Sequence, residues 1–347
     1  MSSESIQKVY QTHQQVIEEG FVKSVGQQFN KYAVTNLRGG VGKSSIAFNL
    51  AYEISRKDSL LVTDVCPQSN FTEVLLGGHR TKVDIYSALQ PVILGPAFGD
   101  QVDDLSYKIS KYCEDFKGGK GAWCIAGNAE LFSFPSTLYQ QLNVAYSARN
   151  ENAVRKLLSG LNQILDAEMK DKHCQKALVD TSPFYAGGTH LAWCAVDALI
   201  VPVKVDEHSL ESLELLFRQL TDPARDFMQW NERAGGLKAP KIAAIVMTMV
   251  GSKSQQKSRP DNASRMYIER AIDLCERYPD LFALEEPADA VVITDDFHSA
   301  GRISGAKRIP IAELKVRSFH TVENRRLQVN ASVDRYKKQL KYLASMI

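Results

Sequence analysis

A glycine-rich turn between an expected strand and an expected helix constrains this chain more than any other feature. The turn is Val34-Thr35-Asn36-Leu37-Arg38-Gly39-Gly40-Val41-Gly42-Lys43-Ser44-Ser45. A short apolar strand, 32–34, precedes it, and apolar residues at helical spacing follow it. In that context the glycines allow backbone N–H groups to surround phosphate oxygens, and the helix N-terminus adds partial positive charge. The sequence therefore predicts a phosphate-binding loop rather than an ordinary surface turn.

The loop departs from the general phosphate-loop pattern Gly-x-x-x-x-Gly-Lys-Ser/Thr, because Leu37 stands where the first glycine is expected. In the general pattern Lys43 would reach the β- and γ-phosphates and the Ser44 hydroxyl would bind Mg²⁺. The run from Arg38 to Ser44 resembles the deviant loop of the ParA/MinD family, in which a lysine stands in place of Arg38. The expected nucleotide-binding residues of the loop are Arg38, Gly39, Gly40, Val41, Gly42, Lys43, Ser44 and Ser45.

The resemblance implies ATP and Mg²⁺ as cofactors, and an ATP-dependent homodimer that sandwiches two nucleotides. In the family the first lysine of the loop contacts the phosphates of the partner. Arg38 carries the same charge on a planar fork suited to phosphate oxygens, so we expect dimerisation on ATP to be retained. The alternative is that Arg38 pairs with a surface acid.

A second buried strand, 60–64, ends in Asp64 and continues as Val65-Cys66-Pro67-Gln68-Ser69-Asn70-Phe71-Thr72. This run is similar to the family's Asp-x-Asp-Pro-Gln-x-Asn-x-Thr. Asp64 matches the first Asp, which helps to hold Mg²⁺, but Cys66 stands where the second Asp positions the attacking water. A thiol is a poor acceptor, and loss of one such group commonly lowers a rate by about 10²–10⁴. We therefore expect weak hydrolysis, unless Asp180 or a partner's residue compensates; redox sensing by Cys66 is a less favoured alternative.

A third strand, 177–180, ends in Asp180 and resembles the family's Walker B run, with Ser182 in place of the first proline. Asp180 is expected to orient a Mg²⁺-bound water near the γ-phosphate. The expected metal site is therefore Ser44, Asp64 and Asp180, and the expected catalytic residues are Arg38, Lys43 and Asp180. By resemblance, Met247, Thr248 and Asp296, which lie at the ends of later strands, are expected at the adenine side of the nucleotide.

Strand patterns alternate with helical patterns, which predicts a doubly wound, mostly parallel α/β sheet with helices on both faces. Residues 1–30 are expected to form a helical extension docked on the main body, with a dimer contact as the alternative, and residues 31–347 the ATPase domain with a basic C-terminal helical region. Further expectations are a short helix at 83–89, a surface loop at 111–120, one amphipathic helix at 151–168, a polar loop at 251–261 and a closing helix at about 324–346.

Composition limits the class of protein. An apolar content of 44% and a charged content of 24% are typical of a soluble globular protein, and no run of about 18 apolar residues predicts a membrane span. The six cysteines contain no Cys-x-x-Cys pair, and the N-terminus lacks a signal-peptide pattern. We expect a cytoplasmic protein with reduced thiols and no zinc or iron–sulfur site.

Charge is concentrated at the C-terminal end. Residues 302–347 contain eleven Lys/Arg and three Asp/Glu, a local balance of +8 against +2 for the whole chain. Such a basic end suggests a polyanionic partner, and ParA relatives bind DNA non-specifically near this region. The alternative is a solvated helix face. The expected DNA-contact residues are Arg302, Lys307, Arg308, Lys315 and Arg317.

The preferred hypothesis is a ParA-like partition protein for plasmid or chromosome segregation. Its ATP-bound dimer would bind DNA non-specifically on the nucleoid, and a ParB-like or other activating protein would trigger release. One alternative is a MinD-like membrane switch, in which Leu340, Leu343, Met346 and Ile347 face lipid. Core packing is the favoured explanation of those four residues, so we expect no stable membrane association. The other alternative is a nucleotide-binding regulatory or scaffold subunit with little hydrolysis.

Overall fold

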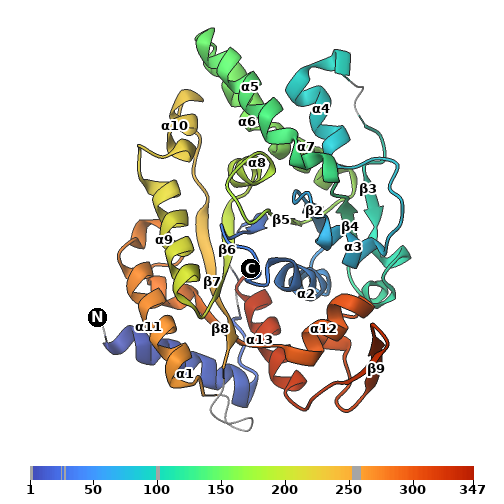
Figure 1. Ribbon diagram of the computed structural model, residues 1–347, viewed down its shortest axis with the longest axis vertical. Coiled ribbons are helices and arrows are strands. Elements are labelled where there is room, and N and C mark those ends of the chain that lie inside the picture. Colours follow the sequence, from blue (N-terminus) through green and yellow to red (C-terminus); the bar gives the residue numbers. More distant parts are fainter. Residues whose placement is uncertain (1–2, 25, 27–28, 99–101, 252–258) are drawn as a thin grey trace.

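The centre of the computed structural model, which describes residues 3–24, 26, 29–98, 102–251 and 259–347, is a sheet of eight strands (Figure 1). The strand order is β3-β4-β2-β5-β1-β6-β7-β8, and every neighbouring pair is parallel except β3 with β4. The predicted doubly wound α/β fold is thereby confirmed. The strands are β1 (Lys31–Val34), β2 (Leu60–Asp64), β3 (Ser106–Lys108), β4 (Ala122–Ile125), β5 (Lys176–Asp180), β6 (Ala198–Lys204), β7 (Lys241–Val250) and β8 (Val291–Asp295).

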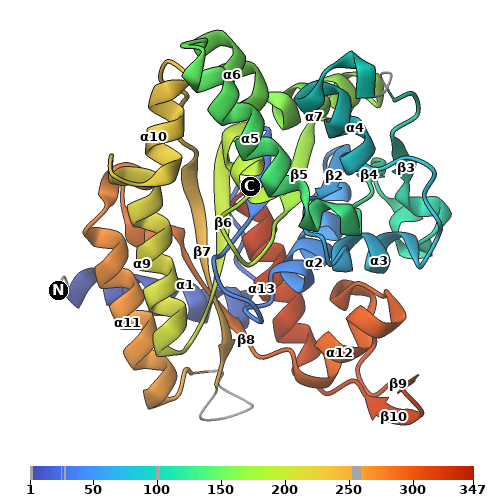
Figure 2. The same cartoon turned by 45° about the horizontal axis from the view of Figure 1, so that its top comes forward.

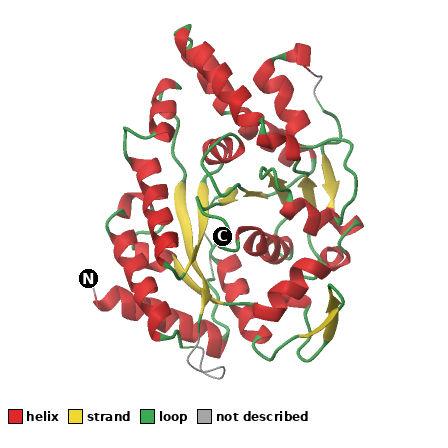
Figure 3. Ribbon diagram, in the orientation of Figure 1, coloured by secondary structure: helices red, strands yellow, loops and turns green. Residues whose placement is uncertain are grey.

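Helices cover both faces of this sheet, as Figure 3 shows in red around the yellow strands. The core on one face includes α2, α3, α12 and α13, and the core on the other includes α4 to α11. The helices are α1 (Ser3–Glu19), α2 (Lys43–Ser55), α3 (Asn70–Leu76), α4 (Ile85–Leu94), α5 (Phe134–Ser147), α6 (Glu151–Leu158), α7 (Gly160–Asp171), α8 (Gly188–Ala195), α9 (Glu207–Thr221), α10 (Asp226–Arg233), α11 (Asn262–Glu276), α12 (His298–Lys307) and α13 (Val333–Ser345).

The central strands are buried on both sides, which explains their continuous apolar sequences. In β1, Ala33 belongs to the core beneath one helical layer, whereas Tyr32 and Val34 belong to the core beneath the other. Strand β1 lies between β5 and β6, so its carboxyl end opens at the point where the strand order reverses direction. Ligands of open α/β sheets bind in the crevice at such a point.

The N-terminal helix α1 packs against the main body. Val9 and Val16 are buried, and Val16 shares a core with α13. Lys338 of α13 donates a hydrogen bond from Nζ to the carbonyl of Ile17 (2.6 Å). Lys8 forms ion pairs with Glu286, which precedes the short 3-10 helix Pro287–Ala290, and with Asp289, which lies within that helix.

Two segment predictions are wrong. The single helix predicted at 151–168 is two helices, α6 and α7, that meet at Ser159. Gly160, the first residue of α7, lies so close to α4 that a Cβ there would be 2.9 Å from Val92 Cγ1. The segment predicted as a surface loop at 111–120 overlaps two 3-10 helices, Ile109–Lys111 and Glu114–Gly118. Phe116 of the second of these helices is buried.

The closing helix begins later than predicted. Residues 319–328 form an antiparallel hairpin, β9 (Phe319–Val322) with β10 (Arg325–Gln328), and α13 begins at Val333. The turn residues Glu323 and Asn324 both have positive φ (47° and 63°), as a two-residue type I′ hairpin turn requires. Residues 324–332 are therefore not part of the closing helix.

The four apolar residues that could have faced lipid lie in the core. Leu340, Leu343, Met346 and Ile347 are each at most 7% exposed and pack in the same core as α2. In the described parts of the chain, no helix combines the length and the apolar character needed to cross a bilayer.

Candidate nucleotide-binding site

The glycine-rich loop connects β1 to α2 at the centre of the sheet (Figure 2). Gly40 and Gly42 have φ values of 73° and 90°, which residues with a Cβ rarely adopt. No atom lies within 4 Å of the position that a Cβ would take at either glycine. The space beside both glycines, at the N-terminus of α2, is therefore open, as a phosphate cradle requires.

Lys43 is folded into this loop. Its side chain is buried, and Nζ donates a hydrogen bond to the carbonyl of Arg38 (2.7 Å). Burial lowers the pKa of the Lys43 ammonium, and the neighbouring Asp180 opposes that shift. Thr248 holds the loop from β7, because its hydroxyl donates to the carbonyl of Val41 (3.0 Å).

Asn36, which sequence reasoning did not select, anchors the start of the loop. Its Nδ2 donates to the carbonyl of Pro202 in β6 (2.7 Å), and its Oδ1 accepts from the Arg38 N–H (3.0 Å) and from the Ser212 hydroxyl (2.8 Å). Asn36 is fully buried. The loop is therefore tied to β6 and α9, and no motif in the sequence indicated this connection.

The two predicted carboxylates face each other at the ends of adjacent strands. Asp64 of β2 and Asp180 of β5 are register partners. The Ser44 hydroxyl donates to Asp180 Oδ2 (2.6 Å), while Asp180 Oδ1 is buried and has no hydrogen-bond partner among the described residues. Burial and the proximity of Asp64 raise the pKa of Asp180 to about 8, and burial raises the pKa of Asp64 to about 6.

This pair of carboxylates fits a divalent cation. Mg²⁺ prefers oxygen ligands, and a dicationic ion favours the ionised form of both acids. Asp64 is already occupied, because it accepts from the N–H groups of Cys66 (3.0 Å) and Thr72 (2.9 Å). The free Oδ1 of Asp180 and the Ser44 hydroxyl are therefore the groups most available to a Mg²⁺ ion, with Asp64 behind them.

Cys66 lies in this site as a neutral thiol. It is 7% exposed, and burial raises its pKa. Ser182, which is also buried, acts on the thiol in the opposite direction and lowers its pKa. The two positions that depart from the family's acidic and proline pattern are therefore neighbours in this site.

Arg38 pairs with an acid of its own chain. Its guanidinium contacts Asp206 and lies 3.3 Å from the Ser209 hydroxyl. Asp206 is also the N-cap of α9, where it accepts from the Ser209 N–H (2.9 Å). In the isolated chain, Arg38 therefore pairs with a surface acid, as the alternative interpretation of the sequence predicts.

The residues expected at the adenine side are spread along two strand ends. Met247 is fully buried, and its carbonyl accepts a hydrogen bond from Thr294 (3.0 Å). Thr248 contacts the loop, as described above, and Asp296 lies beside His298 (3.3 Å) just after β8. Part of the polar loop predicted after β7, residues 252–258, lies outside the described residues.

The expected DNA-contact residues lie in α12 and in the segment that follows it, at the lower right of Figure 2. Arg302, Lys307, Lys315 and Arg317 are exposed. Arg308 is only half-buried but is engaged internally, since its guanidinium donates to the carbonyl of Tyr112 and covers Gly77.

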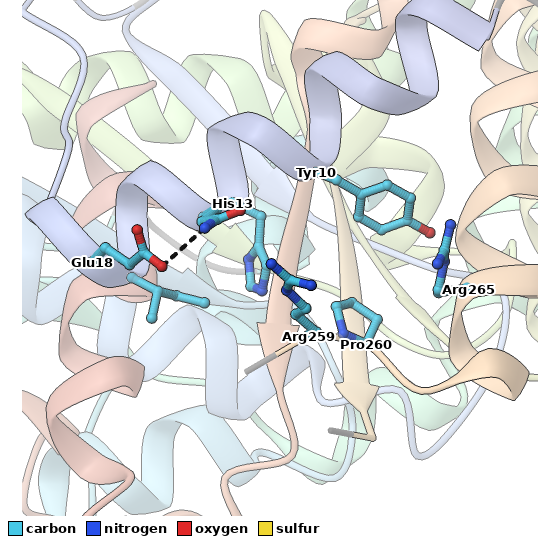
Figure 4. Close-up of a pocket in the computed structure, with 8 residues that line it drawn as sticks. Tyr10, His13, Glu18, Arg259, Pro260 and Arg265 are labelled. Atoms are coloured by element: carbon cyan, nitrogen blue, oxygen red, sulfur yellow. Dashed lines mark hydrogen bonds between the residues drawn. The ribbon is translucent and has the colours of Figure 1, made fainter. Parts of the chain in front are cut away.

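A separate pocket of about 260 Å³ lies between α1 and the start of α11 (Figure 4). Tyr10 and His13 line it from α1, and Arg259 and Arg265 line it from the other side. None of the predicted nucleotide-site residues lines this pocket.

The fold and the paired loop and carboxylates define a P-loop ATPase of the ParA/MinD type. Residues 30–228 match the family described as AAA domain, and the chain belongs to this family. The ATP complex of McdA from Cyanothece is 15% identical and superimposes with a TM-score of 0.63 over 92% of this chain and 97% of that one. A protein of Corynebacterium diphtheriae is 13% identical, with a TM-score of 0.58 over 81% and 97%. The comparison with curated protein sequences gave no match.

Proposed function

We propose that this chain is an ATP-dependent DNA partition protein of the ParA type. In this proposal it binds ATP with Mg²⁺, dimerises in that state and binds DNA non-specifically. The observation that carries the proposal is the open glycine loop beside the Asp64–Asp180 pair. The structural neighbour McdA was solved as an ATP complex, which supports ATP as the nucleotide.

The roles of the loop residues follow from their positions. Lys43 exchanges its hydrogen bond to a backbone carbonyl for phosphate oxygens, and the N–H groups at the start of α2 bind the same phosphates. Ser44 and Asp180 hold Mg²⁺, with Asp64 supporting them. Arg38 is released from Asp206 and contacts the nucleotide of the partner subunit.

Hydrolysis is slow in this proposal. The neutral Cys66 thiol cannot hold a water as a carboxylate does, and its neighbour Ser182 is also uncharged. A residue of an activating partner, ParB-like or otherwise, supplies the missing group or triggers release. This feature equally favours the second candidate, a nucleotide-binding regulatory or scaffold subunit that turns over little ATP.

The proposed place of action is the nucleoid. The exposed cations around α12 provide a surface for DNA phosphates without reading sequence. The membrane alternative has less support, since the apolar residues of the last helix are buried in the core.

The test is binding to non-specific duplex DNA with ATP, ADP or no nucleotide, with phosphate release measured in the same samples. We expect binding with ATP only, and its loss in Lys43→Ala, because the loop then lacks its phosphate-binding ammonium. Phosphate release at a rate typical of an uninhibited ATPase would contradict the slow hydrolysis. Absence of DNA binding in every nucleotide state would refute the partition function and leave the scaffold candidate.

A further inference from the structure

The hairpin β9–β10 stands at the edge of the molecule beside α12, separate from the main sheet (Figures 1 and 2). Its position relative to α12 is held by the Ser299 hydroxyl, which donates to the carbonyl of Gln328 (2.8 Å). At the base of the hairpin, Arg317 and Val329 extend the backbone pairing, with an N–H to carbonyl distance of 2.9 Å. The hairpin is therefore a well-defined element.

The two faces of the hairpin differ in character. Residues opposite each other in an antiparallel pair share a face. Val322 and Leu327 lie on the inner face and pack against the core of α12 and α13. The outer face consists of Phe319, Thr321, Arg326 and Gln328.

All four side chains of this outer face are exposed, and Phe319 is 49% exposed. The Arg326 guanidinium lies 4.1 Å from the centre of the Phe319 ring. Among the described residues, no carboxylate pairs with Arg326. The ring and the cation therefore form one exposed face that is available to a partner.

The charge around the hairpin indicates what kind of partner this is. Residues 302–328 contain seven Lys/Arg and two Asp/Glu. One of the two acids, Glu313, is bound to the Tyr52 hydroxyl. The other, Glu323, lies in the turn, so the outer face itself carries only positive charge.

We propose that the outer face of the β9–β10 hairpin contacts the sugar–phosphate backbone of duplex DNA. The proposal rests on the DNA-binding function proposed above and adds an element to it. Arg, Thr and Gln side chains are among the groups that bind DNA phosphates, and the hairpin presents one of each beside an apolar ring that can cover a sugar.

The chain offers a matched control within the same strand. Arg325 and Arg326 are adjacent, both exposed and equally charged, but alternation along β10 places Arg325 on the inner face. If the outer face alone makes the contact, Arg326→Gln should lower the affinity for DNA and Arg325→Gln should not. If only the total charge matters, the two variants should lower the affinity equally.

The experiment measures duplex DNA affinity of the full chain with ATP between 50 and 300 mM salt. We expect Arg326→Gln to lower the slope of log K against log salt by about 0.9, and the affinity at 0.1 M by about eightfold. Arg325→Gln should change affinity less than about twofold. Phe319→Ala should lower affinity without changing the slope, because it removes no charge. ATP binding, measured separately, should be unchanged in all three variants.

Equal effects of the two arginine substitutions, or no effect of either, would overturn the hairpin contact while leaving ATP-dependent DNA binding in place. A wild-type chain that binds no DNA in any nucleotide state would overturn both proposals. A selective loss in Arg326→Gln and Phe319→Ala would support the contact.

Discussion

The most informative single substitution is Asp180→Asn, studied without nucleotide or metal. Asp180 is buried beside Asp64, and its pKa is raised to about 8. In the unfolded chain the same carboxyl titrates near 3.8. Between these two values the folded chain therefore holds one proton more at this site than the unfolded chain does.

The sign follows from proton linkage. Because the folded state binds the extra proton, the free energy of unfolding falls as pH rises through this window, by at most about 1.4 kcal/mol per pH unit. Near the pKa of the folded state the free energy of unfolding becomes less dependent on pH. The decrease in this free energy from pH 6 to pH 8 is therefore about 2 kcal/mol. Asparagine does not titrate, and its Oδ1 can still accept from Ser44. Asp180→Asn should therefore remove this loss.

The assay is urea denaturation, followed by the fluorescence of the three tryptophans, at pH 6, 7 and 8 in the presence of a chelator. The stability of Asp180→Asn relative to the wild type should rise by about 2 kcal/mol across this range. Ser44→Ala retains both carboxylates but removes a hydrogen bond that lowers the pKa of Asp180, so its stability should still fall between pH 6 and pH 8, at least as steeply as that of the wild type. Parallel stability curves for the wild type and Asp180→Asn would refute the raised pKa. When Mg²⁺ and ATP are added, only the wild type should be strongly stabilised.

Two further substitutions test the neighbouring groups. Cys66→Asp restores a carboxylate next to Asp64 and should raise the rate of phosphate release by about 10²–10⁴. It should also destabilise the metal-free chain, because a third acid joins the buried pair. A malachite-green assay that shows an unchanged turnover rate would contradict this role of Cys66. Asp206→Asn keeps the N-cap of α9 but removes the ion pair with Arg38, so it should strengthen ATP-dependent dimerisation in sedimentation velocity and change stability by less than about 1 kcal/mol. Unaltered dimerisation would show that Asp206 does not restrain Arg38.

The central part of the fold was predictable because its signals are local. A buried parallel strand is a continuous apolar run, and a phosphate loop needs glycines at fixed positions before a helix. These rules located β1, β2 and β5 and the residues at their carboxyl ends. Since neighbouring parallel strands end at one edge of a sheet, the proximity of Ser44, Asp64 and Asp180 followed from the topology.

The missed features depend on contacts between distant segments. The break between α6 and α7 coincides with close packing of Gly160 against α4, about 70 residues earlier in the chain. The hairpin turn uses Glu323 and Asn324, which lack the Asn-Gly or Asp-Gly signature of type I′ turns. Helix α5 lies in a segment that was not assigned. The role of Asn36 as an anchor appears only once β6 and α9 are placed beside the loop.

Both cations of the loop are bound to other groups of the same chain. Lys43 is held by a backbone carbonyl and Arg38 by Asp206, so each must exchange a partner when phosphates bind. Side chains of the Arg38–Asp206 pair are 30% and 26% exposed, and ion pairs with this much solvent contact are worth at most about 1 kcal/mol. The exchange at Arg38 is therefore inexpensive. Because Asp206 also caps α9, the release of Arg38 leaves that helix intact, so the loop can change partners without unfolding its surroundings.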